Sequence, residues 1–397
     1  MCRFERHLLL CEHACRRMES NRDLEAHGLL GESVALSPGS NAIAVHFLPA
    51  SDGRWQQLVN TSNEALPFHH PSWMRTLSAC YGYRAFILAL ADGHERLHAG
   101  LPVMEVTNPL AIDLGSSGVK VGRRKWVALP FTDYCPPLAP NNGDLAHVGD
   151  ALDAARRKKN VSRLEVRADL EVPASFKTVV GVRHTLELHP DPEVVYRTFD
   201  RSQTQRNIRK AKREGVVVLR RGESIDDLAR VYFDLHLETR RRQGVPTQPR
   251  RFFEHLWREM LEPGNGFLLL ASVDGVPIAG GVFLTWNDSV VYKFGASSSR
   301  FWSLRPNNLL FWEAIRWSCE RGFRIFDFGR SDLANHGLRT FKSNWGAHET
   351  PLKYSVISDS APKHIGPTLP RPISAAIRRS PTWVSRLLGE LLYRVAA

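Results

Sequence analysis

Six basic side chains lie within thirteen positions of the chain, between positions 201 and 213. If this segment is helical, Arg206, Arg209, Lys210 and Arg213 share one face, because they follow the i, i+3, i+4, i+7 spacing. Guanidinium groups hold phosphate oxygens through paired hydrogen bonds. We therefore expect this face to bind a phosphate-bearing substrate, with a solvated charged surface as the alternative. Nucleic acid is less favoured, because no aromatic residue interrupts the run.

A second group surrounds the junction between an expected strand and the helix that follows it. The strand ends near Gly295 and Ser297, and the helix begins near Pro306. A glycine lets a ligand approach the backbone closely, and free N–H groups at a helix start attract negative charge. We expect substrate contacts here from Gly295, Ser297, Arg305 and Asn307, with an ordinary strand-to-helix loop as the alternative.

A third group could supply the reaction itself. Asp327 alternates with Phe326 and Phe328, so its carboxylate leaves the expected strand on the face opposite to both rings. Lys342 lies between Phe341 and Trp345 in the sequence. In this partly apolar setting its ammonium could stabilise an oxyanion. The general base would be Asp327 or Asp133, and His336 is a weaker candidate. No Ser-His-Asp or Cys-His arrangement stands out, and no metal site is expected.

The elements that must position these residues occur in two similar sets. Each set contains a hairpin of two strands around an Asp-Gly turn, then a third strand, a loop, a helix and a further strand. The turns are Asp92-Gly93 and Asp274-Gly275, and the helices are expected at 144–158 and 307–321. Further helices are expected at 71–81, 192–199, 203–214, 224–242 and 250–261. The pattern predicts an internal duplication with an α/β or α+β architecture.

Composition narrows the class of protein further. The chain has 397 residues, with 53 Lys and Arg against 41 Asp and Glu, and its formal net charge of +12 favours anionic partners. Its six cysteines form no regular framework, so we expect a reducing compartment. No apolar run is long enough to span a bilayer. The basic tail repeats Trp383, Leu387, Leu391 and Val395 every four residues, which favours an amphipathic helix at a membrane surface or packed on the body.

Three stretches together resemble a known family. They are the run from Arg206 through Gly215, the run from Trp302 through Ile315, and Phe326–Asp332 with the following Gly337–Gly346. They resemble Fem-type (FemAB-like) aminoacyltransferases that build peptidoglycan bridges, which grade into GNAT-family (BioF2-like) N-acyltransferases. The strong similarity covers about 201–354. In this resemblance Phe341 and Lys342 match the family's Phe-Lys pair, and Arg206 and Arg209 match its basic segment.

The resemblance implies tandem GNAT-like domains with mixed sheets flanked by helices. We place the domains at 41–180 and 181–360, after 1–40, which we expect to be disordered, and before the basic tail at 361–397. It also implies transfer of an acyl or aminoacyl group to an amine of a cell-envelope or exopolysaccharide precursor, in the cytoplasm or at the inner face of its membrane. No cofactor would be bound; acyl-CoA or aminoacyl-tRNA would be the co-substrate.

The donor stays open, because two features of the related enzymes are absent. The second half has no heptad run for a coiled-coil arm, and the coenzyme A loop pattern does not precede the helix at 307–321. The alternative of another class is a non-catalytic basic module that binds RNA or anionic lipid.

Overall fold

The computed structural model describes residues 33–35, 44–107, 124–139, 145–172, 175–221, 224–362 and 371–392. The expected disordered segment at 1–40 lies outside these residues except at β1 (Ser33–Ala35), which pairs with β2 (Ala44–Pro49). That short strand was not expected from the sequence, because three residues give no readable periodicity.

Two sets of elements follow one another in the same order. The first is β2, α2 (Gly53–Thr61), α3 (Pro71–Tyr81), β3 (Arg84–Ala91), β4 (Leu97–Thr107), β5 (Arg124–Val127), α4 (Leu145–Lys158), β6 (Arg163–Val166) and β7 (Ser175–Glu187). A helical connection follows, formed by α5 (Pro192–Thr198), the π-helical turn η2 (Arg201–Gln205) and α6 (Arg206–Arg213).

The second set begins at β8 (Val217–Arg221). It continues with η3 (Asp227–Tyr232), α7 (Phe233–Gln243), α8 (Arg250–Leu256), η4 (Trp257–Leu261), β9 (Gly266–Val273), β10 (Val276–Trp286), β11 (Ser289–Ser297), η5 (Ser299–Leu304), α9 (Pro306–Glu320), β12 (Ile325–Ser331), α10 (His336–Ser343) and β13 (His348–Ser358). In both sets a hairpin leads to a third strand, and a helix then returns the chain to a strand parallel to that third strand.

Local sequence explains several of these boundaries. Pro71 starts α3 and Gly82, at φ 73°, ends it, as expected for proline in a first turn and glycine in a left-handed cap. Asp274 and Gly275 both have positive φ, which is the geometry of a tight hairpin turn between β9 and β10. Pro306 similarly starts α9.

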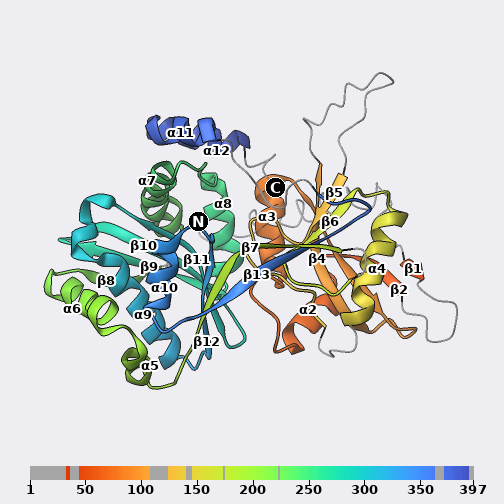
Figure 1. The fold of residues 1–397 in the computed structure, drawn as a ribbon, viewed down its shortest axis with the longest axis horizontal. Coiled ribbons are helices and arrows are strands. Elements are labelled where there is room, and N and C mark those ends of the chain that lie inside the picture. Colours follow the sequence, from red (N-terminus) through yellow and green to blue (C-terminus); the bar gives the residue numbers. More distant parts are fainter. Residues whose placement is uncertain are drawn as a thin grey trace, which may run out of the picture.

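All the described strands belong to one mixed sheet, in the order β1-β2-β3-β4-β5-β6-β13-β7-β12-β11-β10-β9-β8. The two sets meet at its centre, and each gives its last strand to the other. β7 pairs with β12 of the second set, whereas β13 pairs with β6 of the first. β7 and β13 also pair with each other over ten residue pairs, so the halves are joined by backbone hydrogen bonds (Figure 1).

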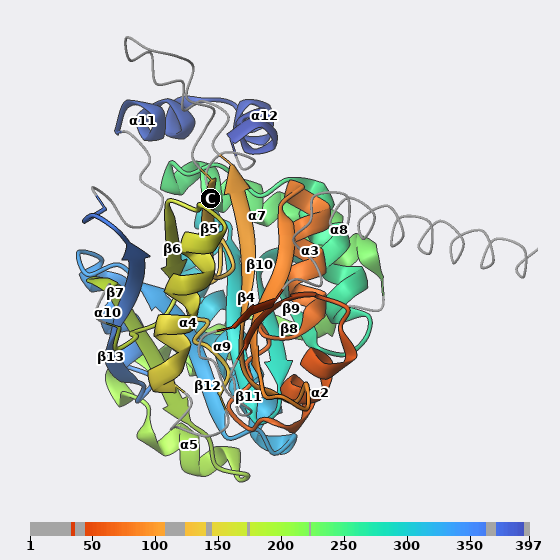
Figure 2. The same cartoon turned by 90° about the vertical axis from the view of Figure 1, so that its right-hand side faces the viewer.

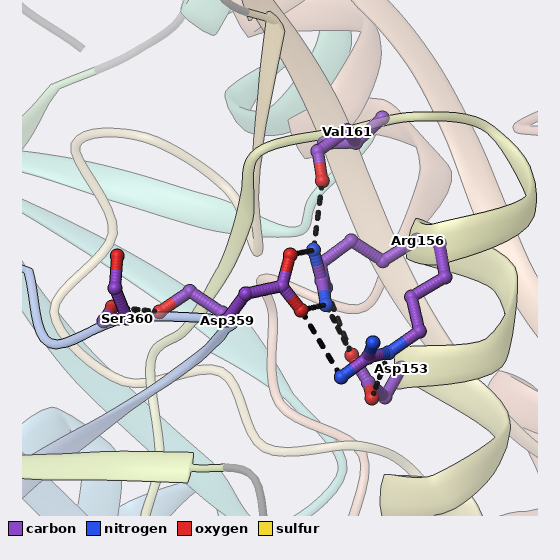
Figure 3. A network of polar contacts seen from close by, with 7 residues as sticks. Asp153, Arg156, Val161, Asp359 and Ser360 are labelled. Carbon is purple, nitrogen blue, oxygen red and sulfur yellow. Dashed lines mark hydrogen bonds and ion pairs between the residues drawn. The ribbon is translucent and has the colours of Figure 1, made fainter.

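A buried arginine fixes the exchanged strand β13 on the first half. Arg156 on α4 is 1% exposed, and its guanidinium contacts both carboxylate oxygens of Asp359, at 2.8 and 3.3 Å. The same side chain donates to the Val161 carbonyl and pairs with Asp153 (Figure 3). Asp359 directly follows β13, so this network anchors the end of the second half's last strand to the first half's helix.

Three apolar clusters fill the layers around the sheet. One lies under α4 against β2 to β6, and another lies under α5, α6 and α9 against β9 to β12. The third joins α2 and α3 of the first half with η3, α7, α8 and η4 of the second, so these helices share one central layer (Figure 2). The proposed domain division at 180/181 falls within β7, which runs through it as one strand.

The basic tail forms two helices, α11 (Arg371–Arg379) and α12 (Thr382–Leu392), where the sequence suggested one. Pro381 separates them, because proline cannot continue a helix from the preceding turn. Both helices contact α7. Val395, the last member of the predicted stripe, lies outside the described residues. No helix in the described ranges is long and apolar enough to cross a membrane.

Candidate functional site

The parallel ladder between β11 and β12 is short. It joins Ser289–Val291 to Ile325–Asp327, although β11 continues to Ser297 and β12 to Ser331. Immediately past the ladder, β12 changes its register with β7: Asp327 faces Thr185, and Arg330 faces Arg183. Two residues of β12, Phe328 and Gly329, therefore lie opposite a single residue of β7. Two residues opposite one is the definition of a β-bulge.

The bulge is held by the side chain that precedes it and by glycine's conformational freedom. Asp327 is 5% exposed, and its Oδ1 accepts the Gly329 N–H at 2.7 Å. Its Oδ2 accepts from Arg183 Nε at 2.8 Å. Gly329 has φ 70°, in the left-handed region that other residues avoid. Both oxygens of Asp327 are thus engaged in shaping the strand.

Lys342 reaches this bulge from α10. Its side chain is 3% exposed, and Nζ donates to the carbonyls of Gly329 and Arg330 at 2.9 and 3.0 Å. Burial lowers the pKa of Lys342 to about 8, against the opposing influence of the carboxylates of Asp133, Asp327 and Asp332. The ammonium has three N–H donors, so one remains for a ligand. The preceding Phe341 packs on Phe311 with ring centroids 5.7 Å apart.

Asp133 comes to the same place from the first half of the chain. A Cβ built on Gly329 would lie 3.5 Å from Asp133 Oδ2, so the carboxylate stands directly beside the bulge. The Asp133 side chain is 38% exposed, and Oδ2 lies 3.8 Å from the buried Lys293 Nζ. The structure thus brings Asp133, Asp327 and Lys342, three residues singled out from the sequence, into one group.

The loop that carries Asp133 is strained and firmly anchored. Leu129 and Phe131 have φ of 58° and 59°, which costs energy for residues with a side chain. Lys293 Nζ donates to the Phe131 carbonyl at 2.7 Å, and the Tyr354 hydroxyl donates to the Asp133 carbonyl at 2.7 Å. These two anchors belong to β11 and β13, so the second half fixes the position of a first-half loop.

Three residues that organise this group were not expected from the sequence, namely Lys293, Arg183 and Tyr354. Lys293 left a detectable signal, because it is a lone charge between Tyr292 and Phe294 in an apolar strand. It is buried against the rings of Phe68, Trp73 and Phe294, and burial lowers its pKa. Arg183 and Tyr354 gave no comparable signal, because their partners lie more than 140 positions away in the chain.

The predicted phosphate-binding face lies on α6 and is exposed to solvent. α6 buries Ile208 and Ala211 in the apolar cluster under α5, α6 and α9, and it leaves Arg206, Arg209 and Arg213 exposed and Lys210 half-buried. The turn before α6 is tied to the residue that ends α10: Asp200 N–H and the Thr204 hydroxyl both donate to the Asn344 carbonyl. Within the described residues no ion pair joins the basic face to Asp133, Asp327 or Lys342, so a shared cavity stays a prediction.

The predicted group at the end of β11 is held together by its own side chains. Ser297 Oγ accepts from Trp302 Nε1 at 3.0 Å and from Asn307 Nδ2 at 3.5 Å. Arg305 has φ 61° and lies at the start of α9, where its side chain is exposed. The space beside Gly295 is occupied by the Tyr292 hydroxyl, so the missing side chain there accommodates a residue of this chain. Ligand contact by these four residues remains a prediction.

A separate cavity of about 340 Å³ lies between β7, α5 and the start of β13. Its lining includes Leu188, Val194 and His348 and contains none of the predicted site residues. Across the described residues, no group of three potential metal ligands comes together. Cys11, His13 and Cys15, which are close together in the sequence, lie outside the described ranges.

Comparison with known proteins bears on this geometry directly. Residues 199–343 match the family described as "Acetyltransferase (GNAT) domain", and this range holds the bulge, Lys293 and Lys342. This part of the chain is therefore similar to GNAT-type acetyltransferase domains. The predicted family and the predicted class of enzyme, an N-acyltransferase, agree with the matched domain.

The chain is also similar to one sequence relative and to solved structures. A lipid II:glycine glycyltransferase of Staphylococcus haemolyticus (strain JCSC1435) is 28% identical over 87 residues, which are 20% of this chain and 21% of the relative. The crystal structure of FemX superposes with a TM-score of 0.61 at 13% identity, covering 78% of this chain and 96% of FemX. The C-terminal domain of a putative lysylphosphatidylglycerol synthetase from Agrobacterium fabrum gives a TM-score of 0.50 at 11% identity, covering 77% and 91%.

These matches confirm the predicted fold class, a mixed α/β fold of the tandem GNAT or Fem type. The sequence match spans only about a fifth of the glycyltransferase, and the structural matches have low identity. Substrates therefore have to be argued from the site itself.

Proposed function

We propose that this protein transfers an acyl or aminoacyl group from an activated ester or thioester to an amine on a phosphate-bearing precursor of the cell envelope or of an exopolysaccharide. One observation carries the proposal: the carboxylate of Asp133 stands beside the bulge that Lys342 holds. A base and a buried cation beside one backbone segment are suited to amine acylation.

The chemistry needs no covalent intermediate on the protein. The acceptor nitrogen attacks the carbonyl carbon of the donor, and its proton passes to the Asp133 carboxylate. The remaining N–H of Lys342 stabilises the negative charge that develops on the carbonyl oxygen, an effect typically worth about 3 kcal/mol. The C–S or C–O bond then breaks, and the thiol or hydroxyl leaves with a proton. Asp327 orients the bulge, because its oxygens already accept two hydrogen bonds.

The acceptor class follows from charge. The exposed guanidinium groups of Arg206 and Arg209, with Lys210 and Arg213, supply a face suited to a phosphate or diphosphate. The similarity to a lipid II:glycine glycyltransferase supports a cell-envelope acceptor. Such a precursor is made at the cytoplasmic side of the membrane, so we place the protein there.

Two donors remain in the proposal, acyl-CoA and aminoacyl-tRNA. The GNAT-domain match favours acyl-CoA, and the glycyltransferase match favours aminoacyl-tRNA. Thermal unfolding with each candidate separates them, because a ligand that binds the folded state raises the midpoint. Steeply salt-dependent binding of any RNA, without turnover, would instead support a non-catalytic basic module.

Lys342→Met tests the proposed chemistry. With the donor found by thermal unfolding, we expect the variant to lose roughly a hundredfold or more in kcat, because a preorganised donor to the oxyanion is removed. Lys353→Met is the matched control: Lys353 lies on β13, is 45% exposed and pairs with Asp169. Turnover by Lys342→Met within a few-fold of the parent, with the control unchanged, would remove the assigned role.

A further inference from the structure

The two tail helices follow one another along one edge of the molecule, against α7 (Figures 1 and 2). Ile377 of α11 is fully buried, and Arg378 Nη2 donates to the Gln243 carbonyl at the end of α7. The tail is therefore docked on the body, and the question is which face of α12 does the docking.

Two small residues of α12 face the body. Ser385 is fully buried, and Gly389, one turn later, is buried so closely that a Cβ there would collide with the Thr247 carbonyl. Two large apolar residues point the other way: Trp383 is 66% exposed and Leu387 is 53% exposed. They are four positions apart and so form a stripe on the outer face. This is the reverse of a helix that packs its apolar stripe on the core.

Positive charge surrounds this outer stripe. Arg378, Arg379 and Arg386 are exposed, and Glu390 is the one acidic residue of 371–392, against four arginines. A second exposed ring packs against the same supporting helix: Trp302 of η5 is 46% exposed, and the Arg242 guanidinium of α7 lies 4.6 Å from its centre. Exposed tryptophan beside arginine is the combination that suits the boundary between lipid headgroups and acyl chains.

We propose that α12 docks the protein on an anionic lipid bilayer, with Trp383 and Leu387 entering the headgroup region. Charge complementarity selects this occupant: exposed arginines attract anionic headgroups, by about fivefold in partitioning for each residue near the surface. An aliphatic leucine in the stripe offers nothing to a nucleotide base, which stacks on aromatic rings. The inference does not depend on the proposed function, because it concerns binding and not turnover.

The docked face is linked to the site through α7. Thr239 and Arg242 of this helix both donate to the Ser297 carbonyl, at 3.2 and 3.0 Å, at the end of β11. β11 is the strand that carries Lys293. Bilayer contact would therefore take place beside the helix that holds the end of this strand.

Vesicle co-sedimentation of the full chain tests this proposal. We expect binding to vesicles of phosphatidylcholine with phosphatidylglycerol, and much weaker binding to phosphatidylcholine alone. Trp383→Ser/Leu387→Ser should lower the affinity at least tenfold, because the inserted side chains are lost. Arg378→Gln/Arg379→Gln/Arg386→Gln should remove most of the preference for the anionic lipid.

The matched control removes equally exposed apolar side chains elsewhere. Val217 and Leu219 on the edge strand β8 are 53% and 45% exposed, and Val217→Ser/Leu219→Ser should bind vesicles as the parent does. Thermal unfolding of each variant checks that folding is unchanged. The proposal is overturned if the parent protein does not bind anionic vesicles. It is equally overturned if Trp383→Ser/Leu387→Ser binds them as tightly as the parent. It is also overturned if light scattering shows a dimer that this variant dissolves, or if the stripe proves to bind RNA and not vesicles.

Discussion

The two halves of the sheet repeat one order of elements, yet they use the segment after the third strand differently. In the first half, β5 leads into residues 128–139, which fold back on their own sheet through bridges between Gly100 and Leu138 and between Cys135 and Arg167. In the second half, β11 continues to Ser297, and one 3₁₀ turn leads directly into α9. After the third strand, the first half thus has a long loop, whereas the second half has only a short turn.

This difference divides the work between the halves. The first-half loop turns through two strained residues and presents Asp133 outward, toward the bulge of β12. The second half provides the bulge itself, with Gly329 and the Lys342 ammonium. We infer that duplication gave two similar frames, of which one carries the proposed reaction centre and the other completes it with a carboxylate.

The exchanged strands make such sharing mechanically reasonable. Because β7 and β13 each pair with the opposite half, the two frames cannot separate without breaking backbone hydrogen bonds. A site whose groups come from both halves needs this rigidity, since a misplacement of about 1 Å can cost a hundredfold in rate.

Removing the first half's contribution should give the largest effect. We expect Asp133→Asn to lower kcat/KM by roughly 10²- to 10⁴-fold, because the amide cannot accept the proton of the attacking amine. The loop should keep its place, since its anchors are the backbone carbonyls of Phe131 and Asp133. Steady-state kinetics of amine acylation would measure the loss.

Asp332→Asn is the appropriate control for that variant. Asp332 is 72% exposed and pairs with Arg330, and its carboxylate also acts on the Lys342 pKa. If both variants lose activity equally, the loss comes from removing negative charge near Lys342 and not from removing a base. The assignment of a base to the first half would then be wrong.

The second half contributes the Lys342 ammonium, and its loss at high pH should lower kcat/KM. We expect this effect to be intermediate in size. The pKa of Lys342 is lowered to about 8, so the ammonium is present below that pH and is lost above it. If the charge stabilises the oxyanion, kcat/KM falls about tenfold per pH unit above about 8. In Lys342→Arg this fall should disappear, because a guanidinium stays protonated beyond pH 12. A rate that instead rises through pH 8 would indicate that Lys342 acts as a base.

The smallest effect should come from removing the hydrogen bond that joins the Asp133 loop to the exchanged strand β13. Tyr354→Phe removes the 2.7 Å hydrogen bond from β13 to the Asp133 carbonyl. We expect a loss of about 1 kcal/mol in the free energy of unfolding, the typical contribution of one such bond. Chemical denaturation would measure it. An unchanged stability, with activity also unchanged, would show that β13 is not needed to hold the first-half loop.

Much of this fold could be predicted, because much of it is local. The helix at 71–81 was predicted to the residue, and the Asp274-Gly275 turn and the proline start of α9 were also foreseen. Turn chemistry, caps and periodicity act over a few residues, so they are visible in the sequence. The repeated order of elements followed from the same local signals.

The candidate site was predictable only residue by residue. The sequence indicates three polar side chains that could act in catalysis, Asp133, Asp327 and Lys342. It does not indicate that they lie close together in the fold. Their meeting depends on the bulge at Gly329 and on the loop held by Lys293, and both require contacts across the sheet. Long-range pairing leaves no periodic mark in the chain.

The sequence by itself determined which segments become helices and strands, where the charges gather and that two similar sets of elements exist, because those properties depend on near neighbours. Only the tertiary structure decided that β7 and β13 change places, that the outer stripe of α12 faces away from the body, and that a first-half carboxylate stands beside a second-half bulge. These outcomes depend on which surfaces bury each other, and that choice is made by the folded chain as a whole.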